Sequence, residues 1–140
     1  GTASRPLVHV EDMARAFIQV LKSSEEKING QVFNVGSNEN NFIVKEIAKI
    51  VESIVPNSKV SFGDNVSKDS RTYNVNFDKI RNELGFRPKR KLEEGVREMY
   101  NKFIEISIDE KEFLDKKFYR LKYLKWLIEK KLVNENLEMK

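Results

Sequence analysis

Residues 5–20 read RPLVHVEDMARAFIQV, an apolar run that leads directly into a stretch with helical spacing. The run at residues 7–10 is short and partly β-branched, which predicts a strand. Over residues 11–24, apolar side chains recur at intervals of three and four, including Met13, Phe17 and Leu21. This spacing predicts an amphipathic helix. The junction therefore predicts a strand followed at once by a helix, as in an α/β fold.

Short strands and helices are also expected farther along the chain. The strands are expected at 31–35, 59–63 and 71–75, and the helices at 43–55, 76–84 and 92–103. Gly85 stands where a left-handed helix end is expected. Asp109 and Glu112 resemble a capping box at the start of a helical tail. We therefore predict an α/β (α+β) fragment, in which short strands with flanking helices precede a helical C-terminal tail.

The composition is that of a soluble globular protein. The chain has 140 residues, 39% hydrophobic and 34% charged, with no apolar run near the roughly 18 residues that span a bilayer. The N-terminal residues show no charged-then-apolar leader, so we expect a cytoplasmic protein with no membrane partner. Cysteine is absent and histidine occurs once, which excludes disulfides and leaves little room for a zinc site.

The net charge is +4, and many of the basic residues follow residue 110. Acidic residues are interleaved with them, which favours a solvated helix face. An anionic partner for this basic tail is the alternative interpretation.

Several short motifs occur in a fixed order along the chain. They are RPLVHVED at 5–12, FNVG at 33–36, DSRTY at 69–73, NFDKI at 76–80, LGFRP at 84–88, LEEG at 92–95 and RLKYLKWL at 120–127. Each is weak alone, but their joint order resembles the C-terminal part of the NAD-dependent epimerase/dehydratase branch of the extended short-chain dehydrogenase/reductase family. The resemblance implies a substrate-binding region over residues 1–108 and a helical tail over residues 109–140.

The resemblance also implies what lies outside this chain. Relatives have an N-terminal Rossmann domain that holds NAD or NADP, with a Gly-rich turn at the pyrophosphate and a Tyr and Lys that transfer protons. The printed sequence has neither a Gly-rich dinucleotide loop nor a Tyr followed four residues later by Lys. We therefore expect the substrate-side part of a nucleotide-sugar enzyme, with no cofactor site of its own, inactive alone, and binding nucleotide-sugar weakly or not at all.

Three residues match positions that contact the sugar donor in the family. Arg5 matches the arginine that points at the nucleotide diphosphate, a task suited to a forked, permanently charged guanidinium. Asp69 and Arg71 match the segment that closes over ribose and phosphates. The alternatives are a surface arginine at position 5 and a loop ion pair between Asp69 and Arg71. Tyr73, in the same segment, is more typical of a packed strand aromatic than of a ligand contact.

Three further residues are expected to be structural. His9 lies in an apolar run with no acid or nucleophile pattern beside it, so we predict a satisfied histidine and not a catalytic one. Asp12 resembles the family aspartate at a helix start, where it would cap amides and interact with the helix dipole. Gly36 is expected to allow a close backbone turn.

The expected absence of the Rossmann domain predicts self-association. An apolar face and a sheet edge would otherwise be left open. We expect them to be covered by a second copy, by strand pairing or by the helical tail. Two other functions stay open: an oligomerisation or interaction domain that uses the basic tail and, less favoured, a nucleic-acid-binding module.

Overall fold

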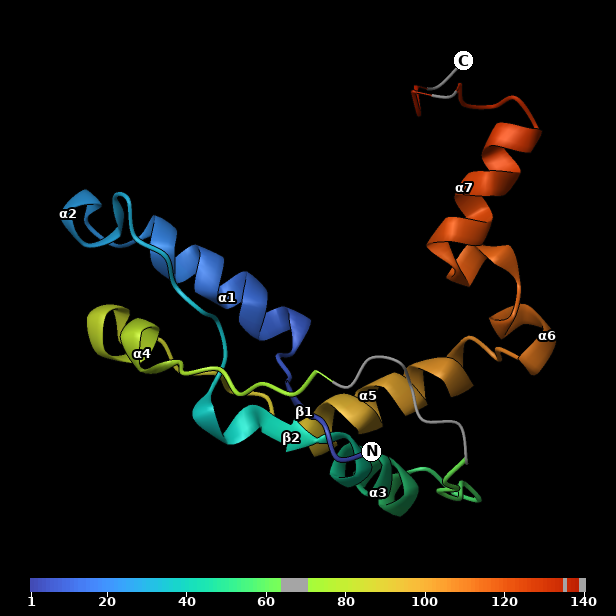
Figure 1. Ribbon diagram of the computed structural model, residues 1–140, viewed down its shortest axis with the longest axis horizontal. Coiled ribbons are helices and arrows are strands. Elements are labelled where there is room, and N and C mark those ends of the chain that lie inside the picture. The colour runs from blue at the N-terminus through green and yellow to red at the C-terminus, as the bar shows by residue number, and fades with distance from the viewer. Residues whose placement is uncertain (64–70, 135, 139–140) are drawn as a thin grey trace. The chain divides into compact units, whose positions relative to one another are not determined.

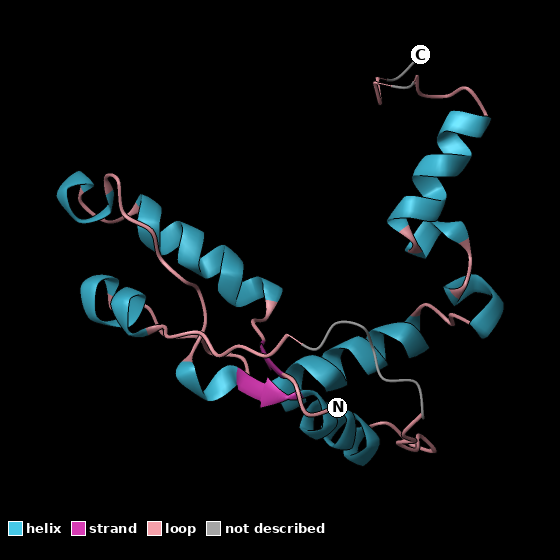
Figure 2. Cartoon of the chain, viewed as in Figure 1, coloured by secondary structure: helices cyan, strands magenta, loops and turns pink. Residues whose placement is uncertain are grey.

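The computed structural model describes residues 1–63, 71–134 and 136–138. These residues are mostly helical, with one small two-stranded sheet (Figures 1 and 2). The chain divides into two compact units, Gly1–Tyr100 and Asn101–Lys140. This architecture is consistent with an α/β fragment. The division at residue 108 into a substrate-binding region and a tail concerns function, and it stays a prediction.

The elements follow one another in a simple order. The first unit contains β1 (Ser4–Pro6), α1 (Val10–Leu21), α2 (Glu25–Ile28), the 3-10 turn η1 (Asn38–Asn40), β2 (Asn41–Ile43), α3 (Val44–Ile54) and α4 (Asp78–Leu84). Helix α5 (Leu92–Glu105) begins in the first unit, and its last turn belongs to the second. The second unit continues with α6 (Glu110–Phe113), the 3-10 turn η2 (Lys116–Phe118) and α7 (Arg120–Glu129).

The sheet is not where the sequence predicted strands. β1 and β2 pair antiparallel, with Arg5 opposite Phe42. The predictions of strands at 7–10, 31–35, 59–63 and 71–75 are wrong, because these residues lie outside the ladder. Apolar alternation indicates that a segment can be extended, whereas a strand also needs a hydrogen-bonding partner.

The buried core of the first unit lies where α1 meets α4 (Figure 1). Ala16 of α1 packs with Ile80 and Leu84 of α4 and with Phe86 just beyond it. The half-buried Phe33 and Val35 pack against this cluster, so the extended segment 31–35 turns its odd-numbered apolar residues inward without joining a sheet. Each fully buried apolar side chain contributes about 1.5–3 kcal/mol, which fixes α1 on α4.

Helix α4 ends as its sequence predicts. Gly85 follows the last turn in the left-handed region, at φ 66° and ψ 13°. Its amide donates to the Arg81 carbonyl, and the Phe86 amide donates to the Ile80 carbonyl. This closed end turns the chain so that Phe86 returns to the core.

The second unit is the helical tail in three short pieces. Asp109 caps α6 by accepting from the Glu112 amide at 2.7 Å, as the sequence predicts. Phe113 is the centre of a small aromatic cluster and contacts the rings of Phe103, Phe118 and Tyr119. In the portion of the chain that the structure describes, none of the helices has the length and apolar character that crossing a membrane requires.

Candidate functional site

The structure brings Arg5 and Arg71 together from positions 66 residues apart. Arg5 lies in β1, and its Nη1 donates to the main-chain carbonyl of Arg71 and, at 2.8 Å, to that of Ser4. The Ser4 amide donates to Oγ1 of Thr72 at 2.9 Å. The segment 71–75 therefore runs along the edge of the small sheet, with the main chain of Arg71 beside the Arg5 guanidinium.

The other end of this segment is held by an amide side chain. Asn41 of β2 accepts from the Val75 amide at 2.9 Å and donates to the Val75 carbonyl at 3.0 Å. One side chain thus satisfies both backbone groups of Val75, as a neighbouring strand would. Segment 71–75 is fixed in extended form by side chains, and for that reason it lies beside the sheet without being a strand of it.

Tyr73 differs from its prediction as a packed aromatic. The guanidinium of Arg5 lies over its ring, 5.2 Å from the ring centroid, and half of Tyr73 stays exposed. A guanidinium held over an aromatic ring is restricted in position, while its positive charge is not neutralised by the ring. Arg5, Arg71 and Tyr73 together form what we call the arginine edge. Asp69, the third predicted site residue, lies outside the described residues.

The arginine edge contains two kinds of group that suit an anion carrying a planar part. Guanidinium groups donate in forks that fit phosphate oxygens, and an aromatic ring such as the half-exposed Tyr73 offers a stacking surface. The sequence named the two arginines as candidates, and their role stays a prediction. It did not indicate that Tyr73 is exposed, because the alternation in 71–75 places an aromatic on one side of the segment but does not say whether anything covers it.

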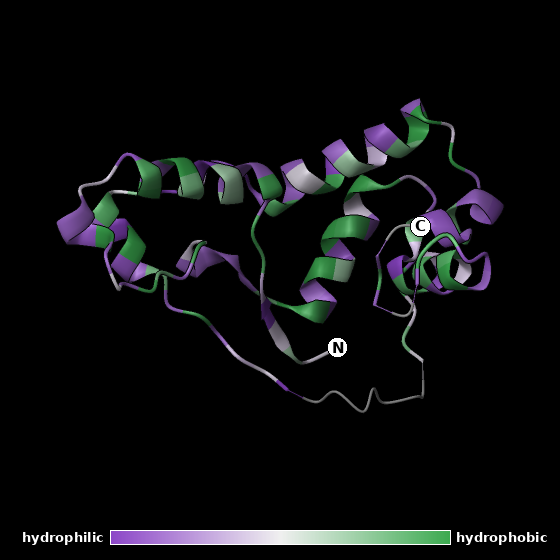
Figure 3. Ribbon diagram, turned by 90° about the horizontal axis from the view of Figure 1, so that it is seen from above, coloured by the Kyte–Doolittle hydropathy of each residue, from purple (hydrophilic) through white to green (hydrophobic). Residues whose placement is uncertain are grey.

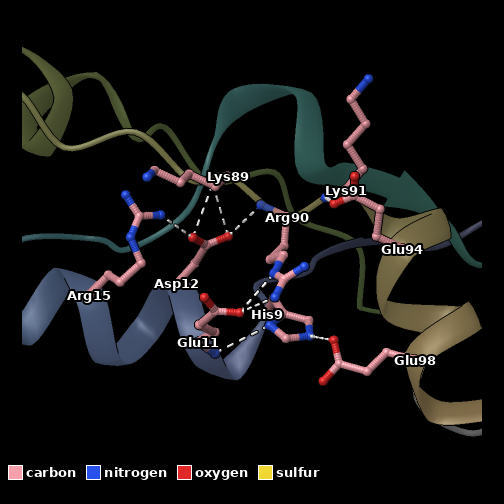
Figure 4. Close-up of polar contacts among 9 residues, drawn as sticks. All are labelled: His9, Glu11, Asp12, Arg15, Lys89, Arg90, Lys91, Glu94 and Glu98. Atoms are coloured by element: carbon pink, nitrogen blue, oxygen red, sulfur yellow. Dashed lines mark hydrogen bonds and ion pairs between the residues drawn. The ribbon is translucent and has the colours of Figure 1, made fainter.

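A second polar cluster connects the start of α1 to residues 89–90, which precede α5, through hydrogen bonds (Figure 4). Asp12 is only 1% exposed, and its carboxylate accepts from the amides of Lys89 at 3.0 Å and Arg90 at 2.9 Å. Arg15, one turn on, donates to the same carboxylate at 2.6 Å. Asp12 is structural, as predicted, but it does not cap α1. It binds the amides of a segment 77 residues away.

The cap of α1 is His9. Its Nδ1 accepts from the Glu11 amide at 3.2 Å, and its Nε2 lies 3.4 Å from Glu98 of α5 (Figure 4). Both ring nitrogens therefore have partners, which agrees with a satisfied histidine. The ring also lies against Gly95, where an added Cβ would be 3.3 Å from Cδ2, so the helix is close to the imidazole.

The electrostatics of this cluster favour its charged form. Burial by itself raises the pKa of Asp12, but hydrogen bonds from the Lys89 and Arg90 amides and from Arg15 outweigh it and hold the pKa below its ordinary value. Glu11 accepts from both Nε and Nη2 of Arg90, and this hydrogen bond raises the pKa of Arg90. The cluster therefore joins α1 to residues 89–90 through charged hydrogen bonds.

A shallow cleft of about 180 Å³ lies between residues 36–39 and the region around α4. Its wall depends on Gly36, where a Cβ would approach the Phe77 ring to 2.6 Å. The prediction for Gly36 is a close backbone turn. The chain does bend there, and the structure adds that the Phe77 ring leaves no room for a Cβ. Arg81 and Arg87 line the cleft, but Arg81 is paired with Asp78 at 2.7 Å. Within residues 1–63, 71–134 and 136–138, no cluster of acidic and histidine side chains could hold a metal ion.

Comparison with known proteins supports the resemblance seen in the motifs. Residues 1–36 match the model of the NAD dependent epimerase/dehydratase family. The chain is 30% identical over 105 residues to dTDP-glucose 4,6-dehydratase of Escherichia coli and to that of Shigella flexneri. It is 29% identical over 97 residues to UDP-glucuronic acid decarboxylase 3 of Arabidopsis thaliana. These are weak but consistent similarities to enzymes whose names specify nucleotide-sugars.

The matches cover most of this chain but little of the relatives. Each match spans 69% of this chain, and 28% of the dehydratases or 27% of the decarboxylase. The chain thus corresponds to less than a third of the length of these relatives. No solved structure matches it significantly.

Proposed function

We propose that this chain forms the nucleotide-holding part of a nucleotide-sugar-modifying enzyme, and that the arginine edge binds the diphosphate. The observation that carries the proposal is the contact of the Arg5 guanidinium with the main chain of Arg71 at the sheet edge, beside a half-exposed Tyr73. The similarity to dTDP-glucose dehydratases and UDP-glucuronic acid decarboxylases supports a nucleoside diphosphate as the ligand class.

Each residue has a distinct part in the proposal. Arg71 donates its forked guanidinium to the phosphates, and Arg5 adds a second positive charge whose position is set by the ring below it. Asp69 accepts from the ribose hydroxyls. The exposed face of Tyr73 takes a planar group of the ligand by stacking.

The proposal assigns binding to this chain and hydride transfer elsewhere. The printed sequence has no Gly-rich dinucleotide loop and no Tyr-x-x-x-Lys pair. NAD or NADP chemistry would therefore be supplied by a dinucleotide-binding domain acting together with these residues, and the chain alone would bind the nucleotide-sugar weakly. Interaction through the tail is compatible with this role, because the tail forms a compact unit of its own.

The test is a titration of the chain with UDP and dTDP, followed by calorimetry or NMR shifts. Arg71→Ala is the sharpest variant, because Arg5 bonds to the main-chain carbonyl of residue 71, which this substitution keeps. We expect binding at least about tenfold weaker, as for the loss of a charge-assisted hydrogen bond. Arg97→Ala, an exposed arginine of α5, is the matched control and should bind like the parent.

Two results would contradict the proposal. One is saturable binding of both diphosphates that Arg71→Ala leaves unchanged. The other is equal weakening by Arg71→Ala and Arg97→Ala, which would indicate that the ligand senses only overall positive charge. Uridine without phosphates should bind less than UDP, since the arginine edge acts on the phosphates.

A further inference from the structure

The side chain of Asn41, in β2, has all of its hydrogen-bonding groups in use. It accepts from the Val75 amide at 2.9 Å and donates to the Val75 carbonyl at 3.0 Å. It also donates to the Asn38 carbonyl at 3.0 Å. Asn41 and Val75 are both half-buried, so their two hydrogen bonds are partly shielded from water. Turning the amide over would set its NH₂ group against the Val75 amide, so only one orientation satisfies every group.

The contact with Asn41 sets the register of residues 71–75. In an extended chain the N–H and C=O of one residue point to the same side, and those of the next residue point to the opposite side. A slip of one residue would therefore turn the backbone groups away from Asn41 and send every side chain to the other face. A slip of two residues would move them by about 6.6 Å. Figure 3 shows the stretch before α4 as extended chain, with hydrophilic purple and hydrophobic green alternating along it.

The other end of the segment contacts β1 through side chains. The Ser4 amide donates to Oγ1 of Thr72 at 2.9 Å. The Arg5 guanidinium donates to the Arg71 carbonyl and lies over the Tyr73 ring. An arginine side chain has many rotamers and can follow a displaced carbonyl, whereas the short side chain of asparagine cannot. The position of the segment therefore depends on Asn41 more than on Arg5.

We infer that Asn41 is a positioning residue for nucleotide binding. It is not one of the groups that we propose to touch the ligand. It acts by fixing residues 71–75 in the register that sets Tyr73 beneath the Arg5 guanidinium and the main chain of Arg71 at the sheet edge. The inference rests on the proposed function, because it adds to the arginine edge the residue that assembles it.

Two substitutions of Asn41 remove the contact in different ways. Asn41→Asp keeps the shape and still accepts from the Val75 amide, but it places a carboxylate oxygen against the carbonyls of Asn38 and Val75. Asn41→Leu removes every hydrogen bond of the side chain without adding charge. Asn82→Asp, at an exposed position of α4, changes the net charge as Asn41→Asp does and is the matched control.

The first measurement is made by NMR without nucleotide. The Val75 amide should exchange its hydrogen at least about tenfold faster in both Asn41 variants, as for a segment that opens locally. The nuclear Overhauser contact between the Arg5 side chain and the Tyr73 ring should weaken at the same time. The amide of Leu84, in the buried core, should exchange as in the parent, which shows that the fold is kept. Asn82→Asp should change none of these signals.

The second measurement is the binding of UDP in a double-mutant cycle. Asn41→Leu should weaken binding by about tenfold, as Arg71→Ala does. The two substitutions together should weaken binding by less than the product of their separate effects, because Asn41 acts through the segment that carries Arg71. A general loss of stability would not produce this coupling. Asn82→Asp should bind UDP like the parent.

Three outcomes would overturn the inference. Unchanged exchange at Val75 in Asn41→Leu would show that Asn41 does not fix the segment. A released segment that still binds UDP like the parent, while Arg71→Ala weakens binding, would show that the register does not matter to the ligand. Separate effects that multiply in full would show that Asn41 acts independently of Arg71.

Failure of the proposed function gives a different result. In that case Arg71→Ala binds UDP like the parent, whereas the exchange at Val75 still decides whether Asn41 fixes the segment.

Discussion

Asp12 shows how one buried carboxylate can join two distant segments. It is almost fully buried, yet its charge is supported by two main-chain amides and by Arg15. A buried carboxylate without such donors would be expected to become neutral. The hydrogen bonds therefore decide both its ionisation and its role in holding α1 to residues 89–90.

This arrangement predicts a large effect of Asp12→Asn on stability. Asparagine keeps one acceptor oxygen but turns an NH₂ group towards amides that themselves donate. We expect the free energy of unfolding to fall by roughly 2 kcal/mol, as for buried donors left without a partner. Urea denaturation followed by circular dichroism measures this loss. Glu83→Gln, an exposed carboxylate of α4, is the control and should change the stability little.

The same residue predicts a pH dependence with a definite sign. The folded pKa of Asp12 lies below the ordinary value of 3.8, so between these two values the unfolded chain binds more protons. The stabilisation is therefore fully present above pH 3.8 and is lost as the pH falls through the folded pKa. The Ser37 hydroxyl lowers the pKa of Glu39 as well, which contributes with the same sign.

Substituting Asp12 by asparagine separates the contribution of Asp12 to this pH dependence from that of Glu39. The difference in stability between parent and variant should be constant above about pH 5 and shrink as the pH falls below 4. A difference that stays the same down to pH 2 would mean that folding does not lower the pKa of Asp12.

At the scale of elements, the end of α4 depends on one backbone conformation. Gly85 has φ 66°, and no heavy atom lies within 4 Å of the position that a Cβ would occupy. Any cost of Gly85→Ala is therefore conformational and not steric. We expect about 1–2 kcal/mol of destabilisation, measured as a lower thermal midpoint.

Gly63→Ala is the matched control for this prediction. Gly63 also has open space around it, but its φ lies outside the left-handed region. The Gly63→Ala substitution should leave the thermal midpoint nearly unchanged or raise it slightly. Equal effects of the two substitutions would show that the left-handed conformation at Gly85 is not what stabilises α4.

At the scale of the whole molecule, the charge and the aromatic residues of the tail bear on the nucleic-acid alternative. Three of the tail's lysines lie over its own rings: Lys116 over Trp126, Lys117 over Phe118 and Lys122 over Tyr119. An aromatic ring with a lysine ammonium over its face offers nucleic-acid bases less stacking surface than an uncovered ring does. With a net charge of only +4, we expect weak binding of any oligonucleotide.

The measurement is fluorescence anisotropy of a labelled single-stranded oligonucleotide at several salt concentrations. Binding at physiological salt should not saturate, and the salt dependence should be shallow, because few phosphates would be neutralised. Tight binding with a steep salt dependence, lost when Lys116 and Lys122 are replaced by alanine, would favour the nucleic-acid function instead.

Local patterns in the sequence determined most of the helices. The apolar spacing of α1, α3 and α5, the glycine after α4 and the Asp109 cap each act within a few residues. Helical hydrogen bonds and caps are local, so these elements could be predicted without knowing the fold. The motif order likewise indicated the family resemblance, and with it Arg5 and Arg71.

Only the tertiary structure decided where the distant partners meet. The true strands pair residues far apart in sequence, Asn41 forms hydrogen bonds with Val75, and Asp12 accepts from the amides of Lys89 and Arg90. The exposed face of Tyr73 also depends on which segments the fold brings near it. The alternation in 31–35 and 71–75 indicated extended chain but could not supply a neighbour for it. A strand, a covered ring or a satisfied buried charge depends on what lies across from it, and that is settled when the chain folds.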